Sequence, residues 1–222
     1  MIFILNIIGL SVALAIFLAI VIQVNYHLNF NKSIKNSENI FTLTIEDDNH
    51  NKAIMPRGIA DRISDSNPHI KNLSFGWFYS DKQKFNLVDG DKLSESFYNN
   101  FYPVTKSFFD TFSFEILEGD LGNANDPNSV IIPQSVADLF SQNGSVIGKN
   151  IRISHSKNYV IVGVYKDFKD NTMVNNHCYT FIPDTENLND MNNWNYTCFM
   201  TLDSKDNIEE VLSSINNMEF KY

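Results

Sequence analysis

Phe108–Asp120 reads FFDTFSFEILEGD and places four phenylalanines within seven positions. Ser107–Thr111 predicts a helical turn, and the alternation over Phe112–Ile116 predicts a strand directly after it. Gly119-Asp120 then opens a loop rich in Asn, Asp and Pro. An aromatic cluster of this kind is usually a protein core or a subunit interface, and we interpret it as the core of a soluble domain.

Downstream of this segment the sequence predicts short strands and one helix. Ser129–Ile132 predicts a strand, and Gln134–Phe140 carries its apolar residues on one side of a helix. Asn150–Ser154 and Tyr159–Lys166 predict two strands that a hairpin at residues 155–157 connects. This middle region is therefore predicted to be rich in β structure.

The regions on either side of the middle mix strands and helices. The predicted elements are strands at Ile40–Ile45, Ile70–Tyr79, Lys84–Val88, Cys178–Ile182 and Tyr196–Leu202, and helices at Met55–Ser66 and Asp206–Asn217. The last helix has the clearest period, because Ile208, Val211 and Ile215 recur at helical spacing. Strands and helices in this order predict an α+β fold, which we expect to form two lobes.

Ile2–Val24 is an apolar run without a charged side chain. As a helix it would be about 34 Å long, which is enough to cross a hydrocarbon core of ~30 Å. A cleaved signal peptide has basic residues before a shorter apolar stretch and small residues after it, whereas Ala13, Ala15 and Ala19 lie inside this run. We therefore predict a retained membrane helix over residues 1–25, followed by a polar linker over residues 26–37.

All the Lys, Arg, Asp and Glu residues lie beyond this run. There are 17 basic and 26 acidic residues, which give a net charge of −9. Such a domain repels nucleic-acid phosphates, so we expect no nucleic acid as a partner, and it lacks a basic cluster dense enough for lipid headgroups. Lys32 and Lys35 flank the helix, and the positive-inside rule taken alone weakly favours a cytoplasmic domain.

No residue pattern indicates catalysis, a metal or a cofactor. The histidines, at positions 27, 50, 69, 155 and 177, never lie three or four residues apart, and no Cys/His ligand spacing, P-loop, GxSxG or GxGxxG motif is present. Asp47 and Asp48 would point to opposite faces of a strand, and no Asp–His pair marks Ser135 as a nucleophile. We expect no catalytic, cofactor-binding or metal-binding residue, and we expect that the chain is not an enzyme.

Cys178 and Cys198 each lie in a predicted strand. In an exported domain they could form a cross-strand disulfide. The alternative is two buried free thiols, which the sequence slightly favours.

Four motifs follow one another through the middle region. They are FFDTFSFEILEGD at Phe108–Asp120, VIIPQSVADLF at Val130–Phe140, IGK at Ile147–Lys149 and YVIVGVYKDF at Tyr159–Phe168. In order and spacing these motifs resemble segments of the periplasmic core domain of MacB/FtsX-like ABC transporter permeases. The helix at Asn6–Ala13 and the linker at Tyr26–Phe41 are similar to the same family, whereas Lys169 stands where the family usually has proline.

The resemblance implies a periplasmic or extracellular domain between the first and second of four transmembrane helices. It implies a porter-like α+β lobe made of residues 38–100 and 175–222, and a β-rich lobe inserted at residues 101–174. The implied partners are a cytoplasmic ABC ATPase subunit, a second permease copy in a dimer, a periplasmic adaptor or substrate protein, and the lipid bilayer. On this basis we expect the domain outside the inner membrane, against the weak charge signal.

The implied function is that of a transporter permease, in which this domain and the first transmembrane helix couple cytoplasmic ATP hydrolysis to movement of substrate or activation of partners. The alternative is a stand-alone single-pass receptor or interaction domain. The sequence ends at Tyr222 and holds one of the four spans. We therefore expect a truncated form or a fragmentary gene product that does not form a complete transport subunit by itself.

Overall fold

The computed structural model describes residues 2–47, 50–89, 92–123, 126–140, 144–153, 157–169 and 171–218. It divides into two compact units. The first contains helix α1 (Ile2–Leu28), the chain as far as Lys35, and Phe168–Asn175. The second contains Asn36–Asp167 and Asn176–Tyr222.

Helix α1 is the predicted apolar helix, and it continues to Leu28, beyond the predicted end at residue 25. The stretch Asn6–Leu28 is long and apolar enough to cross a membrane, and none of its most apolar part is buried by protein. A helix that is apolar on every side requires an apolar environment, which a bilayer supplies.

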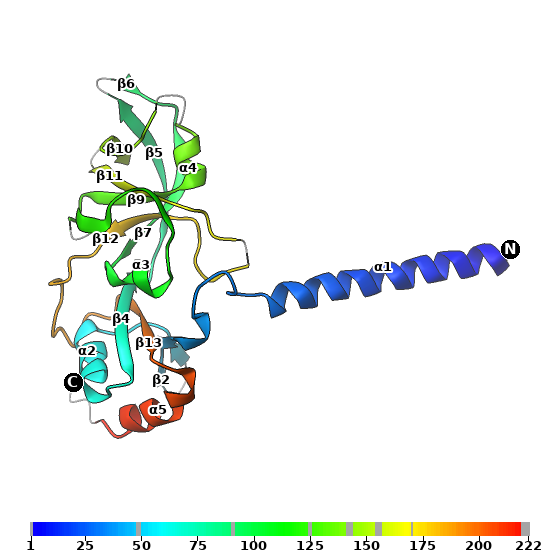
Figure 1. Cartoon of the computed structure of the whole chain (residues 1–222), viewed down its shortest axis with the longest axis horizontal. Coiled ribbons are helices and arrows are strands. Elements are labelled where there is room, and N and C mark those ends of the chain that lie inside the picture. Colours follow the sequence, from blue (N-terminus) through cyan, green and yellow to red (C-terminus); the bar gives the residue numbers. More distant parts are fainter. Residues whose placement is uncertain are drawn as a thin grey trace. The chain divides into compact units, whose positions relative to one another are not determined.

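The second unit mixes helices and strands, which confirms the predicted α+β class (Figure 1). Its helices are α2 (Arg57–Ser66), α3 (Ser107–Thr111), α4 (Gln134–Asp138) and α5 (Ile208–Asn216), with 3-10 turns at Ser37–Asn39, Leu121–Asn123 and Lys205–Asn207. Its strands are β1 (Ile40–Leu43), β2 (Ile45–Asp47), β3 (His50–Lys52), β4 (Ile70–Trp77), β5 (Asp81–Asp89), β6 (Lys92–Leu93), β7 (Phe97–Val104), β8 (Ile116–Gly119), β9 (Ser129–Pro133), β10 (Asn150–Ile153), β11 (Lys157–Tyr165), β12 (Cys178–Phe181) and β13 (Tyr196–Leu202).

Six of the described strands close into a ring of main-chain pairings. The order is β7, β12, β9, β11, β10 and β5, and β5 pairs back onto β7. The β7–β12 and β9–β11 pairs are parallel, and the other pairs are antiparallel. A closed ring leaves no free strand edge within it. We call this part of the second unit the six-stranded barrel.

The interior of the six-stranded barrel is an apolar core. Successive side chains of a strand point to opposite faces, so every second residue of each barrel strand faces inward. Phe85 of β5, Ile151 of β10 and Ile161 of β11 are such residues, and all three are fully buried. One end is closed by α4 and the turn after it, where Phe140 packs against Phe97 with ring centroids 5.1 Å apart.

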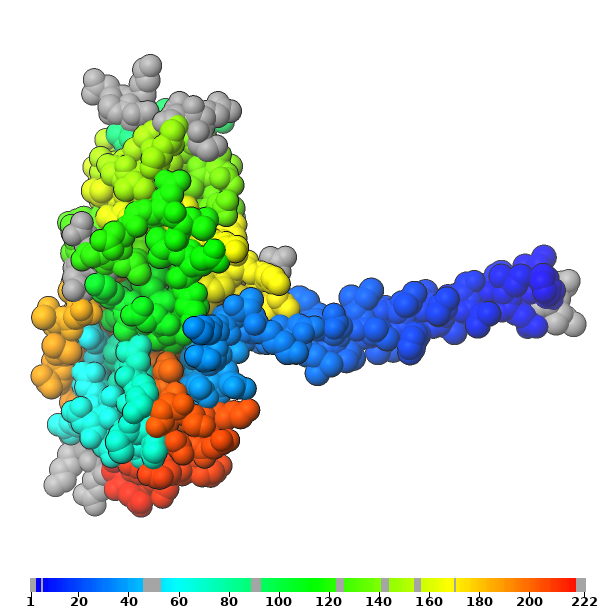
Figure 2. All heavy atoms as spheres, viewed as in Figure 1, coloured from blue at the N-terminus to red at the C-terminus, as the bar shows by residue number. Residues whose placement is uncertain are grey.

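A second core lies beside β4 and β13. It includes Ile59 of α2, Phe75 of β4, Met200 of β13 and Val211 of α5. Figure 2 shows cyan atoms from the region of α2 beside red atoms from the region of α5, although the two helices are far apart in sequence. Helices α2 and α5, both predicted from the sequence, therefore contribute their apolar faces to one core.

Phe108–Asp120 forms a buried aromatic cluster, as interpreted from the sequence. The ring centroids of Phe108 and Phe112 lie 4.6 Å apart, and those of Phe109 and Phe114 lie 4.8 Å apart. The predicted strand over residues 112–116 is wrong, because β8 begins only at Ile116. Ser113 has a φ of 53°, which lies in the left-handed region and interrupts extended backbone.

Strand β7 was missed in the sequence, because Asn99, Asn100 and Pro103 are residue types that strands usually avoid. It nevertheless pairs with β5 and β12, and at one position with β4. The predicted boundary between residues 100 and 101 lies within this strand. The assignment of residues 38–100 and 175–222 to one lobe and 101–174 to the other stays a prediction.

Cys178 of β12 and Cys198 of β13 are free and fully buried. Strands β4 and β7 lie between β12 and β13 in the sheet, and the two thiols belong to different cores. Three strand spacings of about 4.8 Å exceed the ~7 Å that a disulfide allows between Cα atoms. The structure therefore agrees with two buried thiols, and burial raises the pKa of each.

Candidate functional site

The chain that leaves α1 is hydrogen-bonded to Phe168–Asn175 within the first unit. The Asn31 N–H donates to the carbonyl oxygen of Asn171 at 2.9 Å, and the Asn171 side chain donates to the carbonyl oxygen of Asn29 at 3.1 Å. The Met173 N–H donates to Asn31 Oδ1 at 2.7 Å. Asn31 has a φ of 60°, a conformation that asparagine tolerates better than most residues. We call these three bonds the helix junction.

The helix junction gives α1 two routes into the second unit. One route is the chain itself, which continues past Lys35 to β1. The other passes through residues 168–175, because this segment connects β11 to β12, and both are strands of the six-stranded barrel. Residues 168–175 are therefore bonded to the chain after α1 and are continuous in sequence with two barrel strands.

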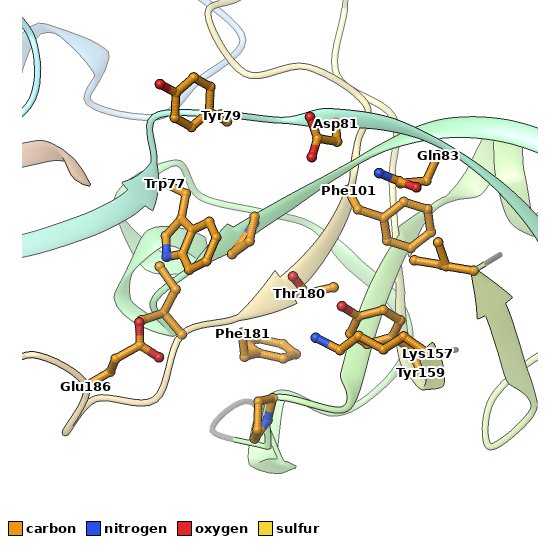
Figure 3. Close-up of a pocket in the computed structure, with 14 residues that line it drawn as sticks. Trp77, Tyr79, Asp81, Gln83, Phe101, Lys157, Tyr159, Thr180, Phe181 and Glu186 are labelled. Carbon is orange, nitrogen blue, oxygen red and sulfur yellow. The ribbon is translucent and has the colours of Figure 1, made fainter. Parts of the chain in front are cut away.

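The end of the six-stranded barrel away from α4 opens into a cavity of ≈ 620 Å³. Its walls come from the start of β5, the end of β7, the start of β11 and the end of β12 (Figure 3). We call this opening the barrel mouth. Phe101 and Tyr159 line it, with their rings stacked at a centroid distance of 5.9 Å.

The inward positions become polar as the strands approach the barrel mouth. On β5 the inward residues change from Phe85, which is fully buried, to Gln83 and Asp81 at the mouth. On β11 they change from Ile161 to Lys157. The inward-facing positions of the same strands therefore form an apolar core inside the barrel and a surface of polar, charged and aromatic side chains at the mouth.

Arg57 holds the connection between β12 and β13 that borders the barrel mouth. Its guanidinium donates to the carbonyl oxygens of Pro183, Asp184 and Glu186 at 3.2, 3.0 and 2.6 Å, and it lies 4.9 Å from the ring centroid of Phe75. Arg57 is buried, and these bonds replace the hydration of its two terminal nitrogens. Glu186 is one of the residues that line the mouth.

Among the described residues, no group of three or more His, Cys, Asp or Glu side chains is arranged to hold a metal. His69 pairs with Asp203 at 2.9 Å, and this hydrogen bond raises the pKa of His69 and lowers that of Asp203 to about 2. Burial lowers the pKa of His177. The Ser135 N–H at the start of α4 donates to Asp167 Oδ1, on the segment after β11, at 3.1 Å, and this bond involves the main chain of Ser135 and not its hydroxyl.

Four of the sequence candidates are not placed. Asp48 and His155 lie outside the described residues, as do the side chains of Asp47 and His50. The absence of catalytic, metal-binding and cofactor-binding residues therefore stays a prediction. The barrel mouth could not be predicted from a motif, because its residues come from five separate segments of the sequence.

The family model of the MacB-like periplasmic core domain matches residues 3–218. The chain belongs to this family. The match begins within α1 and ends just after α5, so it covers both the apolar helix and the domain. This MacB-like chain is thus a membrane-anchored protein with an extracytoplasmic domain, and the cytoplasmic orientation suggested by Lys32 and Lys35 is wrong. Two lysines beside the helix are too few to determine on which side of the membrane the domain lies.

Solved structures of other proteins have a similar fold. The chain is similar to a permease-protein domain from Porphyromonas gingivalis, with 20% identity, a TM-score of 0.66, and 84% of this chain and 87% of that chain covered. It is similar to the periplasmic region of MacB from Actinobacillus actinomycetemcomitans, with 18% identity, a TM-score of 0.55 and 83% of each chain covered.

A third similar structure is the extracellular domain of the noncanonic ABC-type transporter YknZ from Gram-positive bacteria, with 14% identity, a TM-score of 0.53, and 78% of this chain and 88% of that chain covered. A search among curated proteins finds no match. MacB-like family members work with cytoplasmic ATPase partners as ABC transporters.

Proposed function

We propose that this chain is the extracytoplasmic domain and first transmembrane helix of an ABC transporter permease. In this role it couples ATP hydrolysis in the cytoplasm to movement of substrate, or to activation of partners, outside the inner membrane. The observation that carries the proposal is the family match over residues 3–218, which includes α1 together with the domain. The proposed partners are a cytoplasmic ABC ATPase, a second permease copy, and a periplasmic adaptor or substrate protein.

The helix junction supports this function. A coupling element needs its helix attached to the domain at more than a flexible point, because a slack linker dissipates movement. Here Asn29 and Asn31 hold the β11–β12 connection through three hydrogen bonds.

The test is purification of the chain from the membranes of its natural host through a tag at its amino terminus. We expect an ATPase with a GxxxxGK[ST] motif to purify with it, and the complex to hydrolyse ATP in nanodiscs. An environment-sensitive dye on a Lys84→Cys variant, on the exposed outer face of β5, should then respond to ATP. The native thiols are fully buried and should stay unlabelled.

The helix junction provides a matched pair of variants for this experiment. Asn171→Ala removes the bond to Asn29 and should weaken the ATP response of the dye. Asn99→Ala removes a comparable bond, to the carbonyl oxygen of Asn176 at 3.3 Å, and should leave the response unchanged. Purification without an ATPase, and a dye that ignores ATP, would favour the stand-alone receptor instead.

A further inference from the structure

Lys157 is the one basic residue among the described side chains that line the barrel mouth. Its ammonium lies 4.7 Å from the ring centroid of Tyr159, and Figure 3 shows the nitrogen directed into the space beside Phe181. No carboxylate of the described residues forms an ion pair with it. A cation held over an aromatic ring and facing a cavity is available to pair with an acidic group.

The floor of the barrel mouth is formed by two aromatic rings. Phe101 and Tyr159 stack with an interplanar angle of 24°, and they are 7% and 6% exposed. Below them the core residues, among them Ile151 and Ile161, fill the six-stranded barrel. A ligand would therefore rest on these rings and would not pass through the barrel. The cavity of ≈ 620 Å³ has the size of a small-molecule site, and barrel mouths are common places for such sites.

Two carboxylates also line the barrel mouth. Asp81 begins β5, and Glu186 lies in the connection that Arg57 holds. Glu186 already accepts a hydrogen bond from the Tyr196 hydroxyl at 2.9 Å. Ionised carboxylates only accept hydrogen bonds, so they favour N–H or O–H groups on a ligand and repel a second acidic group.

We propose that the barrel mouth binds a small amphiphile that carries one acidic group on a flat aromatic or other apolar body. The acidic group pairs with Lys157, and the body packs against the exposed parts of Phe101 and Tyr159 at the floor of the mouth. Donor groups of the ligand face Asp81 or Glu186. This site goes beyond the proposed coupling function, because binding requires neither nucleotide nor an ATPase.

The test uses the full chain in phosphatidylcholine nanodiscs and isothermal titration calorimetry, with empty nanodiscs subtracted. The probes are 8-anilinonaphthalene-1-sulfonate and N-phenyl-1-naphthylamine, which share a ring system and differ in the acidic group. We expect one site per chain and tighter binding of the sulfonate. Lys157→Met should weaken sulfonate binding roughly fivefold and leave the neutral probe unchanged.

Two further variants serve as controls. Lys84→Met makes the same charge change on the opposite face of β5 and should leave both affinities unchanged. Gln83→Trp places a large side chain in the mouth and should weaken both probes. Equal affinity for the two probes in the native chain, equal losses in the Lys157 and Lys84 variants, or unchanged binding in the Gln83 variant would each overturn the site. Failure to find an ATPase would leave this result untouched.

Discussion

The two ends of the six-stranded barrel are made from the same strands but differ in chemistry. At the closed end, Phe97 and Phe140 pack edge to face against an apolar core that includes Val136 of α4. At the barrel mouth, the same strands present Asp81, Gln83 and Lys157 around an aromatic floor. The closed end is thus built for stability and the mouth for contact with a ligand, and neighbouring positions of one strand should respond differently to mutation.

The largest expected difference lies between two inward residues of β5. Phe85→Ala should lower the free energy of unfolding by about 3–5 kcal/mol, because a fully buried ring is lost and a cavity remains. Gln83→Ala, two residues nearer the mouth, should change it by less than about 0.5 kcal/mol. Urea unfolding followed by circular dichroism measures both. Equal losses would remove the distinction between core and mouth.

Two glycines with positive φ allow the stability cost of backbone strain alone to be compared with the cost of strain plus a steric clash. Gly119 has a φ of 83°, and a Cβ atom there would meet the carbonyl oxygen of Val162 on β11, whereas a Cβ atom at Gly148, with a φ of 79°, meets nothing within 4 Å. Gly148→Ala should cost about 1 kcal/mol from backbone strain alone. Gly119→Ala should cost at least about 2 kcal/mol more, measured by the same unfolding experiment.

The border of the barrel mouth depends on a buried charge. Arg57→Met leaves the carbonyl oxygens of residues 183, 184 and 186 without their donor, so the free energy of unfolding should fall by about 2–3 kcal/mol. Arg62→Met, on an exposed position of α2, is the control and should be almost neutral. If both variants unfold alike, Arg57 does not hold this border.

The smallest effect concerns His69 and Asp203, which lie outside the barrel. The pKa of His69 should exceed 6.5 by NMR titration and return towards 6.5 in Asp203→Asn. The stabilisation through His69 is therefore fully present below pH 6.5 and is lost as pH rises through the folded-state pKa. That through Asp203 is present above its unfolded pKa of 3.8 and is lost as pH falls through about 2. An unchanged His69 pKa in the variant would contradict the pairing.

The sequence predicted the elements whose local pattern agrees with their packing. Helices α2 and α5 were found from their apolar spacing, and β9, β11 and β13 from their β-branched residues. Strand β7 was not predicted, because its Asn and Pro residues disfavour a strand locally and it is paired on one side with β12, which is distant in sequence. The barrel mouth was not predicted either, because it exists only once the strands pair into a closed ring, which includes the pairing of β5 with β7.

An engineered thiol can report on which side of the membrane the domain lies. Lys84→Cys is exposed on β5, whereas Cys178 and Cys198 are fully buried and should not react. A membrane-impermeant maleimide is added to spheroplasts that carry the full chain. We expect labelling of the Lys84 variant without lysis, at the level found after lysis. Labelling that requires lysis would place the domain in the cytoplasm and would rule out an extracytoplasmic domain.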